Sequence, residues 1–352
     1  MSRFGPDYSV HGDQEVAYRK VGHRRLFTDP DADSAREHFR SKSRKLVSKV
    51  TTAKKAVSRL LKDGDYLAVG GFGSNRIPTA LLHEIVRQGK NNLGFSGHTA
   101  THDLQILAGG KCINRCDIAY VIGLEARGLS PISRKAFEEG EIEATEWTNA
   151  ALAWRYKAAS MGISFIPTRN MFGTDTLKYS AAVQLPCPYT GKNYIALPAL
   201  YPDLAIIHVH RCDVYGNAQI DGITISDLEL ARAAKRLIIS TERLVPESTI
   251  RQRPESTGIP FYLVDAVIEI PYGAYPANMA YEYFSDEEHL GRWLEVERDE
   301  EQFRSFLQKN IYDVDNHWEY ITLNGGLERM QQLRAEELVY RQKMTEHNPG
   351  RG

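Results

Sequence analysis

Residues 64–78 read GDYLAVGGFGSNRIP, and this stretch decides the fold. Residues 66–69 form a short apolar run of the length and composition that a buried strand has. The glycine-rich residues 70–73 follow, and Pro78 then suits the first position of a helix that carries an apolar stripe. The stretch therefore predicts a strand, a glycine loop and a helix in direct succession.

The same alternation of strand and helix signals continues along the rest of the chain. Strands are expected at 93–95, 117–122, 142–147, 165–167, 194–197, 204–210, 237–240 and 266–270. Helices are expected at 78–88, 103–108, 133–139, 149–161 and 226–234. Strands that alternate with helices predict an α/β fold with an open, mostly parallel sheet and helices on both faces.

The two ends of the chain differ from its middle. Residues 1–45 are polar and are expected to form an extension without a core of its own, which wraps a neighbour or stays mobile. A helix is expected over 43–61, because apolar residues there recur at helical spacing. Residues 46–335 are expected to form the main domain. A mostly helical stretch at 286–343 leads into a charged tail at 336–352.

The charge balance excludes two classes of partner. The 352 residues include 44 Lys and Arg against 45 Asp and Glu, a net charge of -1. Such a chain has no strong electrostatic field that would attract nucleic acid or an anionic membrane.

Residues 1–20 lack the apolar segment of a signal peptide, and no run reaches the roughly 20 apolar residues that span a bilayer. We therefore expect a cytoplasmic protein.

Cysteines and histidines give no metal pattern. The four cysteines are Cys112, Cys116, Cys187 and Cys212. No second Cys/His pair at zinc spacing accompanies the first two, so buried thiols are favoured over a metal site or disulfides. His208 and His210 point the same way on a strand, as metal ligands can, but a packed or hydrogen-bonded pair is the favoured interpretation.

Four segments, in this order, carry a resemblance to a known family: residues 64–78, 162–168, 202–218 and 264–276. Together they resemble the α subunits of family I CoA transferases, most closely the glutaconate type, over roughly residues 45–335. The resemblance implies the CoA-transferase fold, which sugar-phosphate isomerases share. It also implies a heterodimer or α2β2 assembly with a homologous β subunit, with acyl-CoA and a carboxylic acid as substrates and no tightly bound cofactor.

The resemblance further implies covalent catalysis by a glutamate of the β subunit. In such enzymes that carboxylate attacks the acyl-CoA thioester, and the resulting anhydride is converted to a glutamyl-CoA thioester. An oxyanion hole is needed for each tetrahedral intermediate. Glu125 is the nearest imitation of that glutamate in this chain, but it lies where the α chain matches. We therefore expect a partner chain to supply the nucleophile.

The resemblance assigns substrate or CoA binding to residues in three loops and at one strand end: Gly70, Gly71, Phe72, Gly73, Arg76, Gly216, Asn217 and Glu242. The glycines allow a ligand close to the backbone, although a tight turn alone would also explain them. Arg76 could pair with a carboxylate or a CoA phosphate, or be solvated. Turn chemistry alone would explain Gly216 and Asn217, and an ion pair with Arg243 or Arg236 would explain Glu242.

Asn149 lies where the α chains of transferases usually have glutamine and related ring-opening hydrolases have glutamate. An amide can donate a hydrogen bond to an oxyanion but cannot act as a general base, so Asn149 favours transfer. Thr148 or Asn149 could equally cap the following helix. Two alternatives to transfer stay open. One is hydrolysis, C–C cleavage or decarboxylation of a CoA thioester in the breakdown of ring compounds or branched acids, and the other is a non-catalytic subunit.

Overall fold

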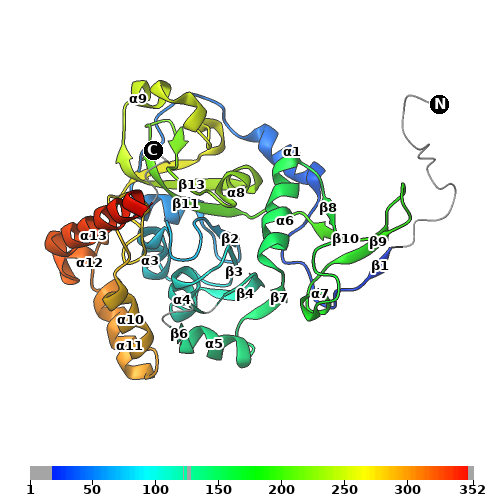
Figure 1. Cartoon of the computed structure of the whole chain (residues 1–352), viewed down its shortest axis with the longest axis horizontal. Coiled ribbons are helices and arrows are strands. Elements are labelled where there is room, and N and C mark those ends of the chain that lie inside the picture. Colours follow the sequence, from blue (N-terminus) through cyan, green and yellow to red (C-terminus); the bar gives the residue numbers. More distant parts are fainter. Residues whose placement is uncertain (1–17, 122, 125–127, 348–352) are drawn as a thin grey trace.

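The computed structural model describes residues 18–121, 123–124 and 128–347, and a large, mostly parallel sheet forms its centre (Figure 1). Seven parallel strands follow the order β14-β13-β11-β2-β3-β4-β7, and β12 pairs antiparallel with β11. Their bounds are β2 (Tyr66–Val69), β3 (Leu93–Gly97), β4 (Ile113–Ile118), β7 (Glu143–Glu146), β11 (Leu204–Cys212), β12 (Ala218–Gln219), β13 (Arg236–Leu244) and β14 (Ala266–Glu269). The predicted fold class is confirmed.

Both faces of this sheet are covered by helices, as its alternating side chains require. Leu67 and Val69 of β2 pack into one hydrophobic core, and Tyr66 and Ala68 pack into the other. The first core lies under α2 (Ala53–Leu60), α3 (Thr79–Arg87), α4 (His102–Gly109) and α5 (Pro131–Glu138). The second lies under α6 (Asn149–Met161) and α8 (Asp227–Ala233). Burial on both faces explains why the strands read as apolar runs rather than alternating ones.

The order of strands reverses at one place in the sheet. From β2, successive strands β3, β4 and β7 lead to one edge, whereas β11, β13 and β14 lead to the other. The chain therefore leaves the carboxyl ends of neighbouring strands β2 and β11 in opposite directions. In open α/β sheets, ligands bind in the crevice that forms at such a switch point.

A smaller antiparallel sheet projects from one side of the molecule (Figure 1). Its order is β1 (Arg19–Lys20), β9 (Val183–Pro186), β10 (Asn193–Pro198) and β8 (Phe165–Thr168). The short helix α7 (Asp175–Lys178) lies beside this sheet, whereas a separate two-strand ribbon of β5 (Gly123–Leu124) and β6 (Gly128–Leu129) lies near α4 and α5 (Figure 1). The small sheet packs beside α6, which links it to the large one.

The C-terminal part is helical, as predicted. It contains α10 (Glu287–Val296), α11 (Glu300–Leu307), a π-helical turn (Gln308–Tyr312), α12 (His317–Leu323) and α13 (Gly326–His347). Before it lie α9 (Glu247–Gln252) and 3-10 turns at Pro254–Ser256 and Phe261–Leu263. Trp293, Phe303 and Phe306 dock these helices into the first core. None of the described helices combines the length and the apolar character needed to cross a bilayer.

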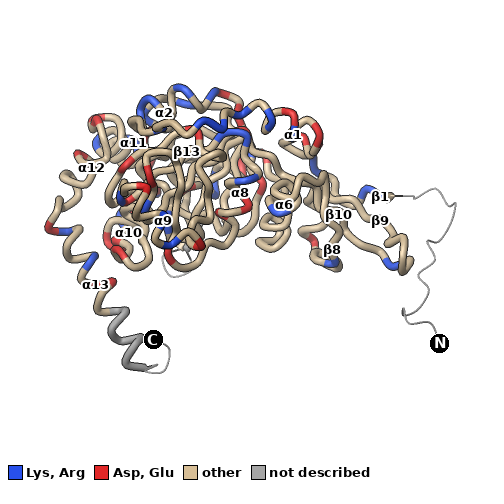
Figure 2. Tube along the Cα trace, turned by 90° about the horizontal axis from the view of Figure 1, so that it is seen from above, with Lys and Arg blue, Asp and Glu red and all other residues tan. Residues whose placement is uncertain are grey.

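The N-terminal segment differs from its prediction. Helix α1 (Ala32–Ser41) packs Ala32 and Ala35 against α6, and the helix predicted over 43–61 begins only at Ala53. Residues before Ala53 are extended, because Lys49 and Thr51 exchange backbone hydrogen bonds with Val267 of β14 at 2.9 Å each. This path from α1 to α2 is rich in Lys and Arg (Figure 2).

The same segment also reaches the opposite edge of the large sheet. The carbonyl of Arg25 accepts a 3.0 Å hydrogen bond from Thr145 of β7, and the Arg25 side chain pairs with Glu143. Residues 18–52 therefore line both outer strands. The strand predicted at 117–122 has different bounds in the structure, since β4 begins four residues earlier, at Ile113, and ends at Ile118. The domain boundaries stay predictions.

Candidate active site

The glycine loop leaves β2 at the switch point, and close contacts explain its first two glycines. A Cβ on Gly70 would lie 2.5 Å from Oδ1 of Asp227. Gly71 has a φ of +90°, and a Cβ there would lie 2.7 Å from the carbonyl oxygen of Asn75. Reciprocal backbone hydrogen bonds of 3.0 and 2.9 Å between Phe72 and Asn75 close the loop. Beside Gly73, an added Cβ would meet no atom within 4 Å, so the space outside the loop is open there.

Arg76 is fully buried and supports the loop from behind. Its Nη2 lies 2.8 Å from Oδ2 of Asp227 and donates a 2.7 Å hydrogen bond to the carbonyl of Ile223. Oδ1 of Asp227 in turn accepts the N–H of Gly71 at 2.8 Å. Nε and Nη1 of Arg76 are buried and have no hydrogen-bond partner in the part of the chain that the structure describes, and the residue has a φ of +62°. Of the alternatives for Arg76, solvation is therefore wrong, and the guanidinium serves the loop as an internal cation.

A second loop, residues 271–283, holds the glycine loop from the other side. The carbonyl of Asn278 accepts the N–H of Arg76 at 2.8 Å, and its own N–H donates to Ser74 at 2.9 Å. The side chain of Asn75 accepts the N–H of Ala280 at 3.2 Å. These contacts join two chain segments that are far apart in the sequence.

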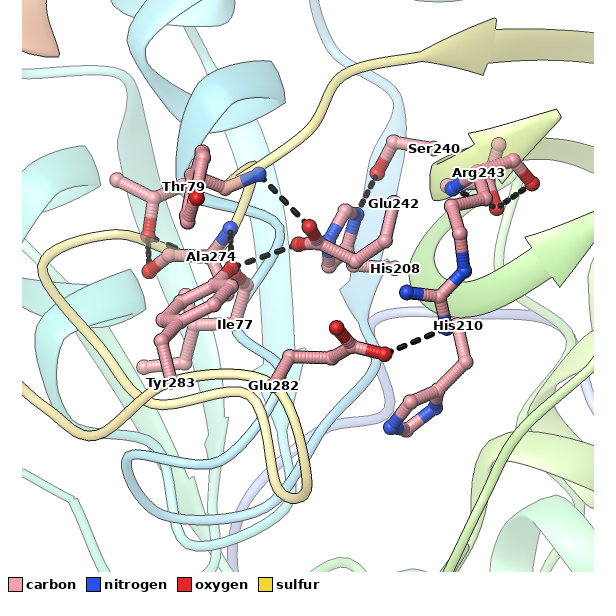
Figure 3. Close-up of polar contacts among 12 residues, drawn as sticks. Ile77, Thr79, His208, His210, Ser240, Glu242, Arg243, Ala274, Glu282 and Tyr283 are labelled. Carbon is pink, nitrogen blue, oxygen red and sulfur yellow. Dashed lines mark hydrogen bonds and ion pairs between the residues drawn. The ribbon is translucent and has the colours of Figure 1, made fainter. Parts of the chain in front are cut away.

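Glu242 anchors that second loop from the end of β13 (Figure 3). Its Oε1 accepts hydrogen bonds of 2.7 Å from His208 Nε2 and from the Tyr283 hydroxyl, and Oε2 accepts the N–H of Tyr272 at 2.8 Å. Burial by itself would raise the pKa of Glu242, but these donors and the histidine outweigh it and lower the pKa. The carboxyl group is therefore ionised and its hydrogen-bonding capacity is used.

The ion pairs expected for Glu242 are wrong. Arg243 pairs with Glu282 at 2.5 Å (Figure 3), because alternate residues of a strand face opposite sides. Arg236 pairs with Asp65 at 3.0 Å. The partner of Glu242 is His208 rather than an arginine.

His210 confirms the hydrogen-bonded interpretation of the two histidines on β11. Its Nε2 donates to the carbonyl of Ala280 at 2.8 Å, and its Nδ1 accepts the N–H of Asp221 at 3.0 Å. Burial lowers the pKa of His210, which keeps the ring neutral. Among the residues that the structure describes, no three His, Cys, Asp or Glu side chains form a metal-binding group.

Gly216 and Asn217 belong to a tight turn after β11. Oδ1 of Asp213 accepts the N–H groups of Tyr215, Gly216 and Asn217 at 2.9 Å each, and the Asn217 side chain donates to Oδ2 at 2.7 Å. Gly216 has a φ of +106°, and a Cβ there would lie 2.8 Å from Val264. Turn chemistry accounts for both residues, and a binding role for them stays a prediction.

Asn149 is the first residue of α6, and Thr148 is its cap. The Thr148 hydroxyl accepts the N–H of Ala151 at 3.1 Å. Among the described residues, Oδ1 of Asn149 is buried without a hydrogen-bond partner, so the cap does not use it. Asn149 lies at the end of β7, three strands from the glycine loop within the sheet. Its chemical role stays a prediction. Glu125 lies outside the described residues.

The loop after β3 contributes residues that the sequence analysis missed. His98 packs edge to face on Phe72, with ring centroids 5.4 Å apart, and the Thr101 hydroxyl donates to the carbonyl of Gly73 at 2.9 Å. Asp103 accepts the N–H of Thr101 at 2.6 Å, and burial raises the pKa of this carboxyl to about 6. The sequence could have indicated these residues, because they come directly after a predicted strand. The carboxyl ends of parallel strands lie along one edge of the sheet, where ligands bind.

The carboxylates around the glycine loop share one property. Asp103, Asp227 and Glu242 are each no more than 6% exposed, and each accepts hydrogen bonds from the protein. A carboxylate must be exposed to attack a substrate carbonyl. The described surroundings of the loop therefore offer hydrogen-bond donors and open space rather than a nucleophile.

Known proteins share both the sequence pattern and the fold. Residues 50–270 match the sequence model of the coenzyme A transferase family. The A subunit of the glutaconate CoA-transferase of Acidaminococcus fermentans is 29% identical over 86% of this chain and 100% of its own length. The solved structure of that enzyme matches with a TM-score of 0.78 over 82% of this chain and 96% of the solved chain.

Two further relatives are named for different activities. The A subunit of the 3-oxoadipate CoA-transferase of Pseudomonas knackmussii is 31% identical over 78% of this chain and 97% of its own length. The structure of a decarboxylase, AibA/AibB, matches with a TM-score of 0.66 and 30% identity over 74% of this chain and 100% of the solved chain. The relatives thus include both transferases and a decarboxylase.

Proposed function

This chain belongs to the coenzyme A transferase family, and on that premise we propose that it is the α subunit of a heteromeric enzyme that moves CoA between an acyl-CoA and a carboxylic acid. The observation that carries the proposal is the open glycine loop at the switch point, surrounded by carboxylates that are buried and hydrogen-bonded. Such a site can hold a thioester, but it needs a nucleophile from another chain.

The proposed reaction uses a glutamate of the β subunit. Its carboxylate oxygen bonds to the thioester carbonyl carbon, and the C–S bond breaks to leave an acyl anhydride and the CoA thiolate. The thiolate then attacks the glutamyl carbonyl, which releases the first acid as a carboxylate and leaves a glutamyl-CoA thioester. A second carboxylate, in our proposal that of a dicarboxylic acid, reverses these steps and leaves as the new acyl-CoA.

The backbone N–H group of Gly73 is the proposed hydrogen-bond donor to the ligand, because glycine lets a ligand approach the backbone closely. Gly71 and Phe72 shape the loop instead, since their N–H groups donate to Asp227 and to the carbonyl of Asn75. Arg76, Gly216, Asn217 and Glu242 have supporting roles in this proposal, since they hold the loops that border the crevice. Asn149 is proposed to donate its amide N–H to an acyl oxygen.

The test is covalent trapping in the assembled enzyme. The chain is co-expressed with its β subunit, the complex is incubated with an acyl-CoA, and borohydride or hydroxylamine is added before mass spectrometry. We expect a modified glutamate on the β chain and exchange of CoA to an added acid. Incubation with free CoA is the control. An adduct that maps to Glu242, or none at all, would contradict the proposal.

A second candidate is supported by the AibA/AibB relative, which is named as a decarboxylase. In that case the complex would release CO₂ or a cleaved product from a CoA thioester without passing CoA to an acid. Hydrolysis of a ring-derived CoA thioester is the related variant. The same incubation separates these outcomes, because CO₂, free CoA and a new acyl-CoA are distinguished by mass spectrometry and gas release.

A further inference from the structure

His98 is the first residue after β3, at the carboxyl edge of the sheet where the glycine loop also lies. Its ring packs on Phe72 of that loop. In the same segment after β3, the Thr101 hydroxyl donates a hydrogen bond to the carbonyl of Gly73. The residue is only half-buried, and the loop on which its ring packs is open to space at Gly73. The histidine is therefore placed beside the proposed ligand contacts.

One hydrogen bond fixes the tautomer of this ring. Nδ1 of His98 lies 3.3 Å from the hydroxyl oxygen of Ser226. Ser226 is buried, and this is its side chain's one hydrogen bond within the described part of the chain. If Nδ1 carried the proton, the buried hydroxyl hydrogen would have no acceptor, which costs about 1–3 kcal/mol. Ser226 therefore donates to Nδ1, and the proton of the neutral ring is on Nε2.

The ring also stays uncharged. Burial lowers the pKa of His98, and the opposing effect of nearby Asp227, which acts to raise it, is smaller. In the described residues, Nε2 has no hydrogen-bond partner although the ring is partly exposed. His98 thus presents a neutral N–H donor beside the glycine loop.

We propose that His98 is a catalytic residue that donates its Nε2–H to the carbonyl oxygen of the bound thioester. This inference rests on the proposed function. When the partner glutamate attacks, the C=O electron pair moves to oxygen, and a fixed donor stabilises that oxyanion. The transfer steps exchange carboxylates and thiolates without moving a proton, so a group that only donates suits this reaction better than an acid or base.

A matched pair of variants tests the donor. In His98→Gln the amide nitrogen can occupy the place of Nε2, whereas in His98→Asn it reaches only the place of Nδ1. Removing one oxyanion donor lowers kcat by about 10²–10³-fold in a known case. In the assembled enzyme we expect a fall of about 10²-fold for His98→Asn, less than about 10-fold for His98→Gln, and nearly unchanged KM. Equal losses in the two variants would overturn the donor role.

A second readout does not depend on transfer. In the complex labelled with ¹⁵N-histidine, the signal of His98, identified by its loss in His98→Gln, should show an Nε2–H tautomer at pH 7 and shift when an acyl-CoA is added. If the signal shifts while no CoA transfer occurs, the proposed function fails and the thioester contact stands. An Nδ1–H tautomer, or a signal that acyl-CoA leaves unmoved, would overturn the inference even in an active transferase.

Discussion

Two buried arginine–aspartate pairs have the same chemistry but different surroundings. Arg155 and Asp117 lie 2.6 Å apart in the second core, where Asp117 also accepts hydrogen bonds from Tyr66 and Trp147 and the guanidinium stacks 4.2 Å from the Trp147 ring. At the switch point, Arg76 and Asp227 are equally buried, but two guanidinium nitrogens and Oδ2 of Asp227 lack hydrogen bonds to the described residues.

The difference separates a structural pair from one that serves a site. Arg155 has one nitrogen without a hydrogen-bond partner among the residues described, and its backbone is an ordinary helix. Arg76 combines unsatisfied donors with a positive φ, two features that cost stability and concentrate at functional sites. We infer that the pair at the switch point is retained for the shape of the glycine loop, and that the pair in the core is retained for stability.

The largest effect on stability is expected from Asp117→Ala. It leaves Arg155 buried without its counter-charge and removes the acceptor of Tyr66 and Trp147. Breaking such a buried pair costs about 3–5 kcal/mol. Urea unfolding of the purified complex measures the loss. The comparison fails if Asp117→Ala destabilises no more than the corresponding change at Asp227.

A somewhat smaller loss of stability, about 3 kcal/mol, is expected from Asp227→Ala, because it also leaves a buried arginine without its counter-charge but removes only one further hydrogen bond, that of Gly71. Activity should fall by at least about 10-fold, since Gly71 loses the acceptor of its N–H. Asp227→Asn is the control, because it keeps an oxygen for Gly71. If both variants keep full activity, the pair does not shape the site.

Glu297 extends the comparison, because it is a buried carboxyl group that has no ion pair among the described residues, unlike Asp117 and Asp227. Burial raises its pKa to about 7, although the hydrogen bond from Ser130 acts to lower it. A raised folded pKa contributes stability at low pH, and this contribution is lost as the pH rises through about 7. From pH 6 to 8 the loss is about 1.4 kcal/mol.

The Glu297→Gln variant tests this pH dependence. Its stability should differ from that of the wild type by an amount that changes between pH 6 and 8, because the amide does not titrate. Denaturant unfolding at both pH values gives the two differences. A constant difference would show that Glu297 is ionised throughout.

The smallest effect on the free energy of unfolding is expected from Leu46→Ser. This residue belongs to neither arginine–aspartate pair, so the variant serves as a reference for the others. The side chain of Leu46 is half exposed on the extended segment before α2. Surface changes of this kind stay within about 0.5 kcal/mol. A loss above about 1.5 kcal/mol would mean that another chain covers this segment in the complex.

The sequence predicted the large sheet because strands buried on both faces are continuous apolar runs, as in Leu204–Cys212. It failed at Leu46 and Val47, whose helical spacing was overridden by backbone pairing of the next residues with Val267. Local pattern could not supply the partners of Arg76 and Glu242, because Asp227 and His208 come from other elements. Such pairings are set by topology.

The segment that lines both outer strands has a consequence for handling the protein. Uncovered strands present free N–H and C=O groups that pair with other molecules and lead to aggregation. The carbonyl of Lys49 accepts the backbone N–H of Val267 of β14, whereas the carbonyl of Arg25 accepts only the side-chain hydroxyl of Thr145 of β7. A truncated version that begins at the family match near residue 50 would therefore expose backbone groups along β14, and it should aggregate more readily than the full-length chain.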